Sequence, residues 1–579
     1  MRSDALDGYL SHIHSLARDG ATPATLLSSI AAVLCDEFGL REPLEIGDGA
    51  ADVIPGVEPP RELCTPWLLG WVHEALLDDT TRRRAGAHYT PAAVARALVD
   101  FASEDHDVGA PVVCDPAVGG GAFLLAAAER LHAAGLSRER IVRELCWGID
   151  VDPLAASVAR ASLALWAGVD APELDEHIVA SDALLDHRWP QRFDLVVGNP
   201  PFQNQLERDT ARAAEYRDQL RDCFGDAASG YVDSAALFLL RSLRLVRRGG
   251  RVALVQPHST LVARDATPTR RRVLDEARIV GVWFADDSVF HASVRVWAPV
   301  LDTSGAHRDG DPIARRLGAD FATVGCGEPS VDQLRRSWGP LVADLAGVPH
   351  VTVKTNGRVG DVATATAGFR DQFYGLVGAV DEHDDADDGS DAWRLITSGL
   401  IDVLRHNWGR APARFARTRY SRPIVRLDRL EGSLAAWVRA QLVPKVLVAT
   451  QSRVVEAVAD PTGAFIPSTP VIAVHVPRER VWHLAAALSA PPVSALALSA
   501  TFGAALATGA LKLSAKQVLE LPLPSDLGAW DRMASLAQQV AANDGAARAT
   551  HLAEFATVAC EAYGAHDDRL VRWWLERIC

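Results

Sequence analysis

Apolar residues recur at helical spacing through the first part of the chain. Leu26, Ile30 and Leu34 fall on one face of such a helix, and the run from Trp67 to Leu77 repeats the pattern. We therefore predict a helical N-terminal domain over residues 1–80.

Between about Pro111 and Leu301 the pattern changes to short strand-like runs that alternate with amphipathic stretches. The strand-like runs are VVCD, CWGID, FDLVVGN and RVALVQP, and the amphipathic ones include FLLAAAERLHAA, LAASVARASLAL and SAALFLLRSLRLV. Strands and helices that alternate at this length form an open, doubly wound α/β sheet of the Rossmann-like kind. We assign residues 81–302 to this domain.

The remaining residues, 303–579, mix strand-like pieces such as KVLVATQS and TPVIAVHVP with helical ones, which predicts a second, mixed α/β domain. Two polar segments are expected at the surface. Residues 205–229 are interpreted as a mobile insertion beside the site that the preceding strand forms, and residues 381–391 as an acidic loop.

Composition and charge narrow the class of protein. Of the 579 residues, 48% are hydrophobic and 23% are charged, a balance typical of a globular chain rather than a disordered or fibrous one. The net charge is −15, and residues 1–80 hold fourteen acids against four arginines. The N-terminal domain is therefore not expected to lie along nucleic-acid phosphates, whereas a basic cleft elsewhere stays compatible with such binding.

The cysteines and the uncharged segments bear on location. The eight cysteines form no CxxC pair, so we predict neither a zinc or other metal site nor a disulfide framework, and a reducing cytoplasm is the expected location. Asp4 and Asp7 stand where a signal peptide would need apolar residues. The uncharged run from Leu484 to Leu511 is interrupted by Pro491 and Pro492, so no membrane span is expected.

A glycine-rich turn follows the first predicted strand. Its residues run Asp115-Pro116-Ala117-Val118-Gly119-Gly120-Gly121-Ala122-Phe123-Leu124, and glycines at such a point let the backbone approach a ligand closely. The turn does not match the GxGxxG dinucleotide pattern, and by itself it is also compatible with a purely structural turn.

Acidic residues end the next two strands. Asp150 lies at the tip of the second strand, where a carboxylate can accept hydrogen bonds from both ribose hydroxyls, and Asp152 is better suited to cap the following helix. Asp182 follows the third strand and could accept a hydrogen bond from an adenine amino group. A helix cap for Asp150 and a solvated loop position for Asp182 are the structural alternatives.

The strand FDLVVG is followed by Asn199-Pro200-Pro201-Phe202. The Asn199 carboxamide and the Pro200 carbonyl supply two acceptors for one exocyclic amino group, because the prolines fix the turn and leave that carbonyl without a regular partner. Hydrogen bonds from both amine protons favour a more tetrahedral nitrogen that can attack an electrophile. Phe202 offers an aromatic face to the base.

In this order the motifs resemble those of the gamma-class N6-adenine DNA methyltransferases of restriction-modification systems. That family has a Tyr-Thr-Pro element ahead of the sheet, which His88-Tyr89-Thr90-Pro91 matches, and the resemblance covers roughly residues 82–301. It implies S-adenosyl-L-methionine as cofactor and Asn199, Pro200, Pro201 and Phe202 as the catalytic turn. The residues implied in cofactor binding are Tyr89, Thr90, Asp115, Ala117, Gly119, Gly121, Asp150, Val151 and Asp182.

The chain departs from the family at the second aromatic that packs on the target base. Trp297 is nearby, but a simple alignment places Leu301 at that position. One-sided stacking or a different aromatic residue stays open.

Residues 303–579 more loosely resemble the target-recognition domains of such methyltransferases, through segments 367–373, 444–448, 460–465 and 512–514. Between Val403 and Leu427 there are seven arginines and no acid, interleaved with Trp408, Phe415 and Tyr420. Although a solvated surface is the alternative, this pattern favours contact with DNA phosphates. The arginines are Arg405, Arg410, Arg414, Arg417, Arg419, Arg422 and Arg426.

These observations predict a sequence-specific methyltransferase that acts on N6 of an adenine flipped out of double-stranded DNA. The four lysines do not form a PD-(D/E)xK arrangement, so a nuclease of a restriction or antiviral defence system is expected on a separate chain. Two alternatives stay open. Protein-glutamine N5-methyltransferases use a similar Asn-Pro-Pro turn, and a DNA-binding defence subunit could keep the fold without the activity.

Overall fold

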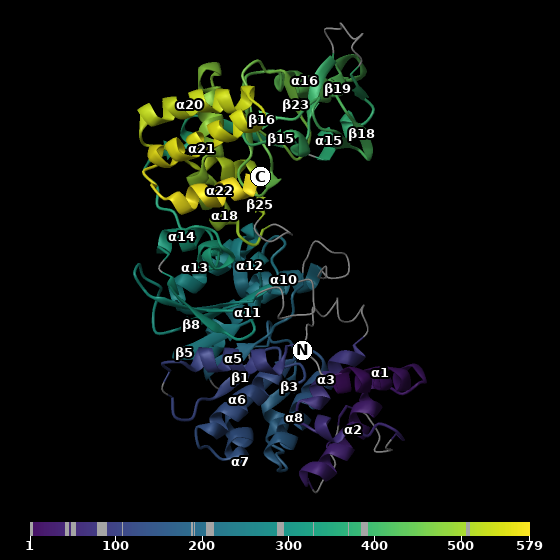
Figure 1. The fold of residues 1–579 in the computed structure, drawn as a ribbon. Coiled ribbons are helices and arrows are strands. Elements are labelled where there is room, and N and C mark those ends of the chain that lie inside the picture. Colours follow the sequence, from purple (N-terminus) through teal and green to yellow (C-terminus); the bar gives the residue numbers. More distant parts are fainter. Residues whose placement is uncertain are drawn as a thin grey trace. The chain divides into compact units, whose positions relative to one another are not determined.

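A computed structural model gives the fold (Figure 1). It describes residues 4–40, 44, 46–47, 54–77, 90–106, 108–186, 189, 192–203, 214–285, 295–327, 329–368, 370–383, 392–504 and 510–578. The chain divides into two compact units, Met1–Leu341 and Val342–Cys579.

The N-terminal region is helical, as predicted. Helices α1 (Asp4–Arg18), α2 (Pro23–Phe38) and α3 (Leu68–Leu76) pack around a core that includes Leu26, Ile30 and Leu34. The same core takes in Val158 and Leu165 of a helix from the sheet region. Because their core is shared, these helices form one unit with the sheet rather than a separate domain.

A large sheet forms the centre of the first unit and confirms the doubly wound α/β prediction. Its strands lie in the order β10-β9-β7-β8-β5-β4-β1-β2-β3, and β6 pairs with β8. Strands β3, β2, β1, β4 and β5 are parallel, whereas β8 runs antiparallel to β5. The strands are β1 (Val113–Asp115), β2 (Cys146–Asp150), β3 (Ile178–Ala180), β4 (Phe193–Gly198), β5 (Val246–Leu254), β6 (Gln256–Pro257), β7 (Arg278–Phe284), β8 (Val296–Asp302), β9 (Ile313–Leu317) and β10 (Ala322–Gly327).

Helices connect the parallel strands in the expected way. The crossover through α6 leads from β1 to β2, and the crossover through α11 leads from β4 to β5. These crossovers run in opposite directions from the centre, so right-handed connections put α6 and α11 on opposite faces of the sheet. The helices of this region are α5 (Ala92–Ser103), α6 (Ala122–Ala133), α7 (Arg138–Arg140), α8 (Pro153–Ala167), α9 (Leu174–His177), α10 (Ala214–Phe224), α11 (Ser234–Leu245), α12 (Ser259–Val262), α13 (Thr267–Glu276) and α14 (Val331–Arg336).

The first unit extends beyond the boundary predicted at residue 302. Strand β9 pairs in parallel with β7, and β10 pairs with β9, so both continue the same sheet. Trp283 donates a hydrogen bond from Nε1 to the carbonyl of Gly318 at 2.9 Å and stacks on Phe321. Residues 303–341 therefore complete the first unit.

The segment predicted as a mobile insertion contains a helix. Residues 214–224 form α10, whose buried Leu220 and Phe224 give it an apolar side, while residues 204–213 lie outside the described residues. The described part of the insertion is therefore regular structure.

The second unit mixes strands and helices, as predicted, and the segments KVLVATQS and TPVIAVHVP supply β20 and β24. Its two larger sheets have the orders β12-β24-β20-β22 and β13-β19-β14-β23. Asp381, expected in an acidic loop, lies in β13, and residues 384–391 of that segment lie outside the described residues. The strands are β11 (Thr355–Arg358), β12 (Thr364–Ala367), β13 (Val380–Glu382), β14 (Ala392–Ile396), β15 (Ile401–Asp402), β16 (Arg405–His406), β17 (Ala413–Phe415), β18 (Thr418–Tyr420), β19 (Pro423–Arg426), β20 (Lys445–Val448), β21 (Gln451–Ser452), β22 (Ala457–Asp460), β23 (Phe465–Pro467), β24 (Ile472–His475), β25 (Leu511–Lys512) and β26 (Pro522–Pro524).

The helices of the second unit are mostly C-terminal. They are α15 (Arg370–Leu376), α16 (Gly432–Ala440), α17 (Val481–Ser489), α18 (Pro491–Thr501), α19 (Ala515–Leu519), α20 (Leu527–Ala542), α21 (Gly545–Ala562) and α22 (Asp568–Ile578). Among the described residues, no single helix has the length and apolar composition to cross a membrane. The segments Arg478–Ser489 and Pro491–Thr501, bent by 60° at their junction, reach that length and composition only as a pair.

Candidate functional site

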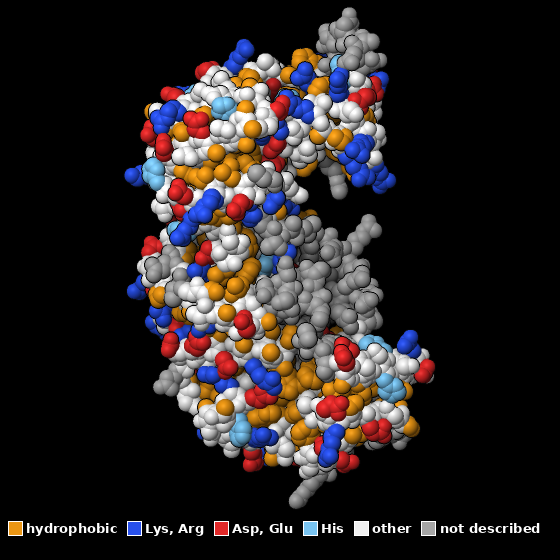
Figure 2. Space-filling model, in the orientation of Figure 1, with side chains coloured by type: hydrophobic (Ala, Val, Ile, Leu, Met, Phe, Trp, Pro, Cys, Tyr) orange, Lys and Arg blue, Asp and Glu red, His pale blue; other side chains and the backbone are white. Residues whose placement is uncertain are grey.

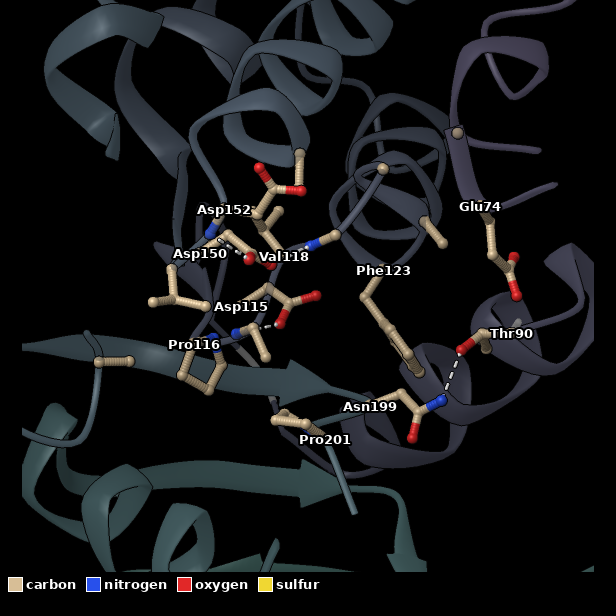
Figure 3. Close-up of a pocket in the computed structure, with 18 of the residues that line it drawn as sticks. Glu74, Thr90, Asp115, Pro116, Val118, Phe123, Asp150, Asp152, Asn199 and Pro201 are labelled. Carbon is tan, nitrogen blue, oxygen red and sulfur yellow. Dashed lines mark hydrogen bonds between the residues drawn. The ribbon is translucent and has the colours of Figure 1, made fainter. Parts of the chain in front are cut away.

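Three predicted site residues meet at the carboxyl ends of the central strands. Asp115 ends β1, Asp150 ends β2 and Asn199 follows β4. The strand order reverses between β1 and β4, and ligands of doubly wound sheets bind at such a point. All three residues line one cavity of about 910 Å³ (Figure 3), a volume suited to a cofactor-sized ligand.

The glycine turn between β1 and α6 forms one wall of this cavity. Gly119 and Gly121 have φ angles of 51° and 88°, in the region that favours glycine. The Gly119 N–H donates to Asp150 Oδ2 at 2.9 Å, which ties the turn to the end of β2. Gly119 and Ala117 line the cavity, whereas Gly121, the N-cap of α6, does not.

Of the two acids at the end of β2, Asp152 caps the next helix as predicted, and the ribose contact of Asp150 stays a prediction. Asp150 accepts a second hydrogen bond, at Oδ1 from the Asp152 N–H, so two backbone donors orient its carboxylate. Asp152 caps α8 by accepting from the Leu154 N–H, and its pKa is lowered by contact with His73, whose Nε2 lies 3.5 Å from Asp152 Oδ2. Val151, between them, is 75% exposed and lines the cavity mouth.

Asp115 is the most deeply buried acid of the site. It is 1% exposed, and burial, reinforced by the nearby charge of Asp150, raises its pKa to about 8 although the Ala117 N–H donates to it. A Cβ atom at Gly198 would lie 2.4 Å from Asp115 Oδ1. Only glycine at the end of β4 therefore lets the carboxylate and that strand approach so closely.

The turn after β4 is held from two sides. Asn199 Nδ2 donates to Thr90 Oγ1 at 3.0 Å, which directs the carboxamide oxygen away from Thr90 (Figure 3). On the other side, Ser234 Oγ donates to the Pro201 carbonyl at 2.6 Å. The carboxamide is thus oriented before any ligand arrives.

The four residues of this turn differ in whether they line the cavity. Asn199 and Pro201 line the cavity, Pro200 is buried, and Phe202 is half-buried against the main core. Thr90 lines the cavity as well, whereas Tyr89 lies outside the described residues.

Neither position considered for a second stacking aromatic faces the cavity. Trp297 and Leu301 are both buried in β8, and Trp297 donates from Nε1 to Thr260 Oγ1 at 3.0 Å. One-sided stacking of the target base and stacking by a different aromatic residue both stay open.

Sequence reasoning missed a contact at the end of β3. Asp182 lines the cavity and accepts hydrogen bonds from the Leu184 N–H and from the Tyr216 hydroxyl, the latter at 2.7 Å. Tyr216 belongs to α10, eighteen residues after the end of β4. Its sequence signal was weak, because it is one of two aromatic residues in a mostly polar segment.

Helix α3 is the second missed contribution. Residues spaced three and four apart on its cavity side, together with His73, line the site. The sequence signal was one acid, Glu74, in a helical run of mostly apolar residues. The lining residues of α3 and its two caps are Trp67, Gly70, Trp71, His73, Glu74 and Leu77.

The seven-arginine segment is less uniform than its sequence suggested. Acids distant in the sequence pair with three members: Asp544 with Arg405 and Arg410 at 2.7 and 2.6 Å, and Asp381 with Arg426 at 3.5 Å. The segment itself contains no acid, but folding brings in acids from α21's N-terminal cap and from β13, and DNA contact by these arginines stays a prediction.

The aromatic residues of that segment serve its core. Phe415 is buried, Trp408 donates from Nε1 to the Pro423 carbonyl, and Tyr420 packs against the same cluster as Phe415. Arg414, Arg417 and Arg419 are exposed on the hairpin of β17 and β18, where basic side chains gather (Figure 2).

Comparison with known proteins identifies the sheet region. Residues 66–304 match the family model described as N-6 DNA Methylase. This part of the chain is an N-6 DNA methylase domain. The match confirms the resemblance to N6-adenine methyltransferases, and the gamma class stays a prediction.

Curated relatives of the N-6 DNA methylase domain include a type II methyltransferase and a type I restriction enzyme's methylase subunit. The chain is 28% identical over 300 residues to the type II methyltransferase M.PaeR7I of Pseudomonas aeruginosa. This match covers 48% of this chain and 50% of that relative. It is 30% identical over 149 residues to the type I restriction enzyme MjaIX methylase subunit of Methanocaldococcus jannaschii, 25% of this chain and 24% of that one. The chain thus spans half or less of these curated relatives.

Similarity of fold extends further along the chain. The type IIL restriction-modification enzyme MmeI, solved in complex with DNA, has a TM-score of 0.57 at 12% identity, with 89% of this chain and 81% of that chain covered. This likeness concerns the fold alone.

The cavity of the N-6 DNA methylase domain fits the cofactor that its family implies. Five acids line it, and no lysine or arginine does so among the described residues. S-adenosylmethionine carries a sulfonium and an ammonium against one carboxylate, so its net positive charge complements this lining. Asp150 and Asp182 both line the cavity, and their contacts with the ribose and the adenine amino group stay predictions.

Proposed function

We propose that this protein is a sequence-specific DNA methyltransferase that uses S-adenosylmethionine to methylate N6 of adenine. The observation that carries the proposal is the Asn199 carboxamide, oriented by Thr90, in the same cavity as Asp115 and Asp150. An amide acceptor beside an acidic cofactor cavity suits a substrate that presents an exocyclic amine.

The chain's own residues would act by position rather than by acid–base chemistry. The cofactor supplies an electrophilic methyl group when it is bound. The Asn199 carboxamide oxygen accepts from the target amine and draws its lone pair out of the ring, and Phe202 is proposed to contact the base. Holding two reactants in line accounts for most of the expected rate effect. The adenine must leave the duplex to reach this site.

We propose that the β17–β18 hairpin contacts DNA phosphates. Arg414 lies opposite Arg419 in the ladder, and like charges in this arrangement destabilise a hairpin. Its two turn residues, Ala416 and Arg417, have φ angles of 45° and 71°, which non-glycine residues rarely adopt. These like charges are unfavourable for the hairpin by itself, but a bound polyanion would neutralise them. Such an arrangement is therefore expected where DNA binds.

We also propose partners and a location for the protein. DNA is the expected macromolecular substrate, a separate restriction or defence subunit is the expected partner, and the cytoplasm is the expected location. Arg405, Arg410, Arg422 and Arg426 stay secondary candidates for DNA contact.

Asn199→Ala tests the proposed function. The variant should lose detectable N6-methyladenine in DNA, yet keep cofactor affinity within about twofold, because Asn199 is assigned to the amine and not to the cofactor. Methylation is read by sequencing native DNA with single-base detection, and cofactor affinity by calorimetry. Methyl transfer to protein glutamine by the wild type, with none to DNA, would favour the alternative substrate instead.

A further inference from the structure

Helix α3 brings one acid to the cofactor cavity from outside the sheet. Gly70, Glu74 and Leu77 follow one another at spacings of four and three, so they share the face that lines the cavity. Glu74 is half-buried, and its carboxylate points from α3 into the cavity on the side where Thr90 and Asn199 lie (Figure 3). A helix that served only for packing would carry an apolar residue there.

Several contacts hold α3 close to the glycine turn. A Cβ atom at Gly120 would lie 2.4 Å from Gly70 Cα, so the two backbones touch where both residues are glycine. Trp67 donates from Nε1 to Glu129 Oε1 at 3.1 Å, and the Arg96 guanidinium lies 4.7 Å from the centre of the Trp67 ring. Glu74, one turn after Gly70, is therefore held at a defined position above the turn.

Each of the four aspartates of the cavity accepts a hydrogen bond from a backbone N–H of the strand-end loops. Asp115 accepts from Ala117, Asp150 from Gly119 and Asp152, Asp152 from Leu154, and Asp182 from Leu184, in each case from a backbone N–H. No group of three or more His, Cys, Asp or Glu side chains in the described part of the chain is arranged to hold a metal ion. The acidic lining complements a positively charged ligand, and Glu74 is the one acid that the N-terminal helices contribute to it.

The order of the strands indicates which part of the cofactor reaches Glu74. Asp182 and Asp150 follow β3 and β2, and Asn199 follows β4 on the far side of β1. The sulfur atom of the cofactor carries the ribose side, the transferable methyl group and the amino-acid tail. With the ribose at Asp150 and the methyl group beside Asn199, the tail extends from this sulfur toward Thr90. That tail carries an ammonium group, for which a carboxylate is the strongest hydrogen-bond acceptor.

We propose that Glu74 binds the α-ammonium group of the cofactor's amino-acid tail, which makes the N-terminal helices part of the cofactor site. This inference rests on the proposed function. It assigns a binding group to a region that the glycine turn and the strand-end acids do not include.

The test compares ligands that differ in that tail. S-adenosylhomocysteine and methylthioadenosine are both neutral thioethers, and the second lacks the amino-acid tail. Decarboxylated S-adenosylhomocysteine keeps the ammonium and loses the carboxylate. Calorimetry on the full chain should give Glu74→Gln a roughly 10- to 100-fold weaker affinity for both ammonium ligands, the range expected for a charged hydrogen bond, and an unchanged affinity for methylthioadenosine.

Glu62→Gln is the matched control, because Glu62 is an exposed acid just before α3 that does not line the cavity. It should leave all three affinities at the wild-type values. Glu74→Asp keeps the charge but shortens the side chain, so its affinity for S-adenosylhomocysteine should fall between those of Glu74→Gln and the wild type.

Failure of the Glu74 inference can be distinguished from failure of the proposed function. Equal weakening of all three ligands in Glu74→Gln would overturn the inference, because it would mean that Glu74 supports the fold. A preference for S-adenosylhomocysteine over methylthioadenosine that survives in Glu74→Gln but vanishes in Asp115→Asn would also overturn it and move the ammonium to Asp115. If the wild type bound none of these ligands and no S-adenosylmethionine, the proposed function itself would fail.

Discussion

Asp115 illustrates how one buried residue couples stability to pH. Its pKa is raised to about 8, first by burial, whereas an aspartate in an unfolded chain titrates near about 4. Between those values the folded protein holds a proton that the unfolded chain releases. The free energy of unfolding therefore falls as the pH rises through this window, by roughly 1.4 kcal/mol per pH unit for one proton.

Asp115→Asn should remove this dependence. The amide keeps the oxygen that accepts from Ala117 but cannot ionise, so the variant should be more stable than the wild type at pH 8 and should gain less at pH 5. Denaturant unfolding between pH 5 and pH 8 measures the difference. Glu456, whose pKa burial also raises to about 8, titrates in both proteins and cancels from the comparison. Parallel pH profiles would contradict the assignment.

At the scale of elements, the contact between α3 and the glycine turn joins the N-terminal helices to the site. Gly120→Ala should force the two backbones apart, because the new Cβ would lie 2.4 Å from Gly70 Cα. Overpacking of this kind costs about 1–3 kcal/mol. We expect lower thermal stability and weaker cofactor binding together, measured by calorimetry.

Gly8→Ala in α1 is the control for this change, since nothing lies within 4 Å of the Cβ it would add. It should leave cofactor affinity unchanged and stabilise the helix slightly. Wild-type cofactor affinity in Gly120→Ala would show that the glycine turn does not depend on α3.

The β17–β18 hairpin is an element whose exposed charges can be tested as a set. Replacing Arg414, Arg417 and Arg419 with alanine should lower DNA affinity and reduce the slope of log affinity against log salt by up to about three units, at about 0.9 per phosphate contact. Fluorescence anisotropy over a salt series measures both.

A double replacement of Arg405 and Arg410 serves as the comparison, because Asp544 already pairs with both. It should change the salt slope little. A triple variant with the wild-type slope and the wild-type affinity would make the hairpin an ordinary solvated surface.

At the scale of the whole molecule, the division at residue 341 predicts which fragment stands alone. All the residues that line the cofactor cavity lie in Met1–Leu341. A fragment of residues 1–341 should therefore fold and bind S-adenosylhomocysteine as the full chain does, but should not bind DNA through the hairpin.

A fragment of residues 1–302 should be much less stable. It loses β9 and β10, and with them Phe321 against Trp283 and Trp338 against Trp297. Emptying one such aromatic site typically costs about 3–5 kcal/mol. Thermal unfolding of the two fragments measures the difference, and equal melting temperatures would place the boundary at residue 302 after all.

The sequence by itself determined the elements and the chemistry of the strand ends. Hydrophobic periodicity identified the N-terminal helices and the strands before Asp115, Asp150 and Asn199, because burial on one face leaves a period in the sequence. The α8 cap by Asp152 was also readable, since capping is local. Parallel strands in a doubly wound sheet then bring their carboxyl ends to one edge, so these residues were expected together.

Only the tertiary structure decided which distant residues join them. Glu74 and Tyr216 reach the cavity because α3 and α10 pack beside the strand ends, and a helix's own periodicity does not say what it faces. The first unit ends at residue 341 rather than at residue 302 for the same reason, since β9 extends the sheet by pairing with β7. Asp544 and Asp381 neutralise arginines that looked unpaired, because charges far apart in the sequence become neighbours only when the chain folds.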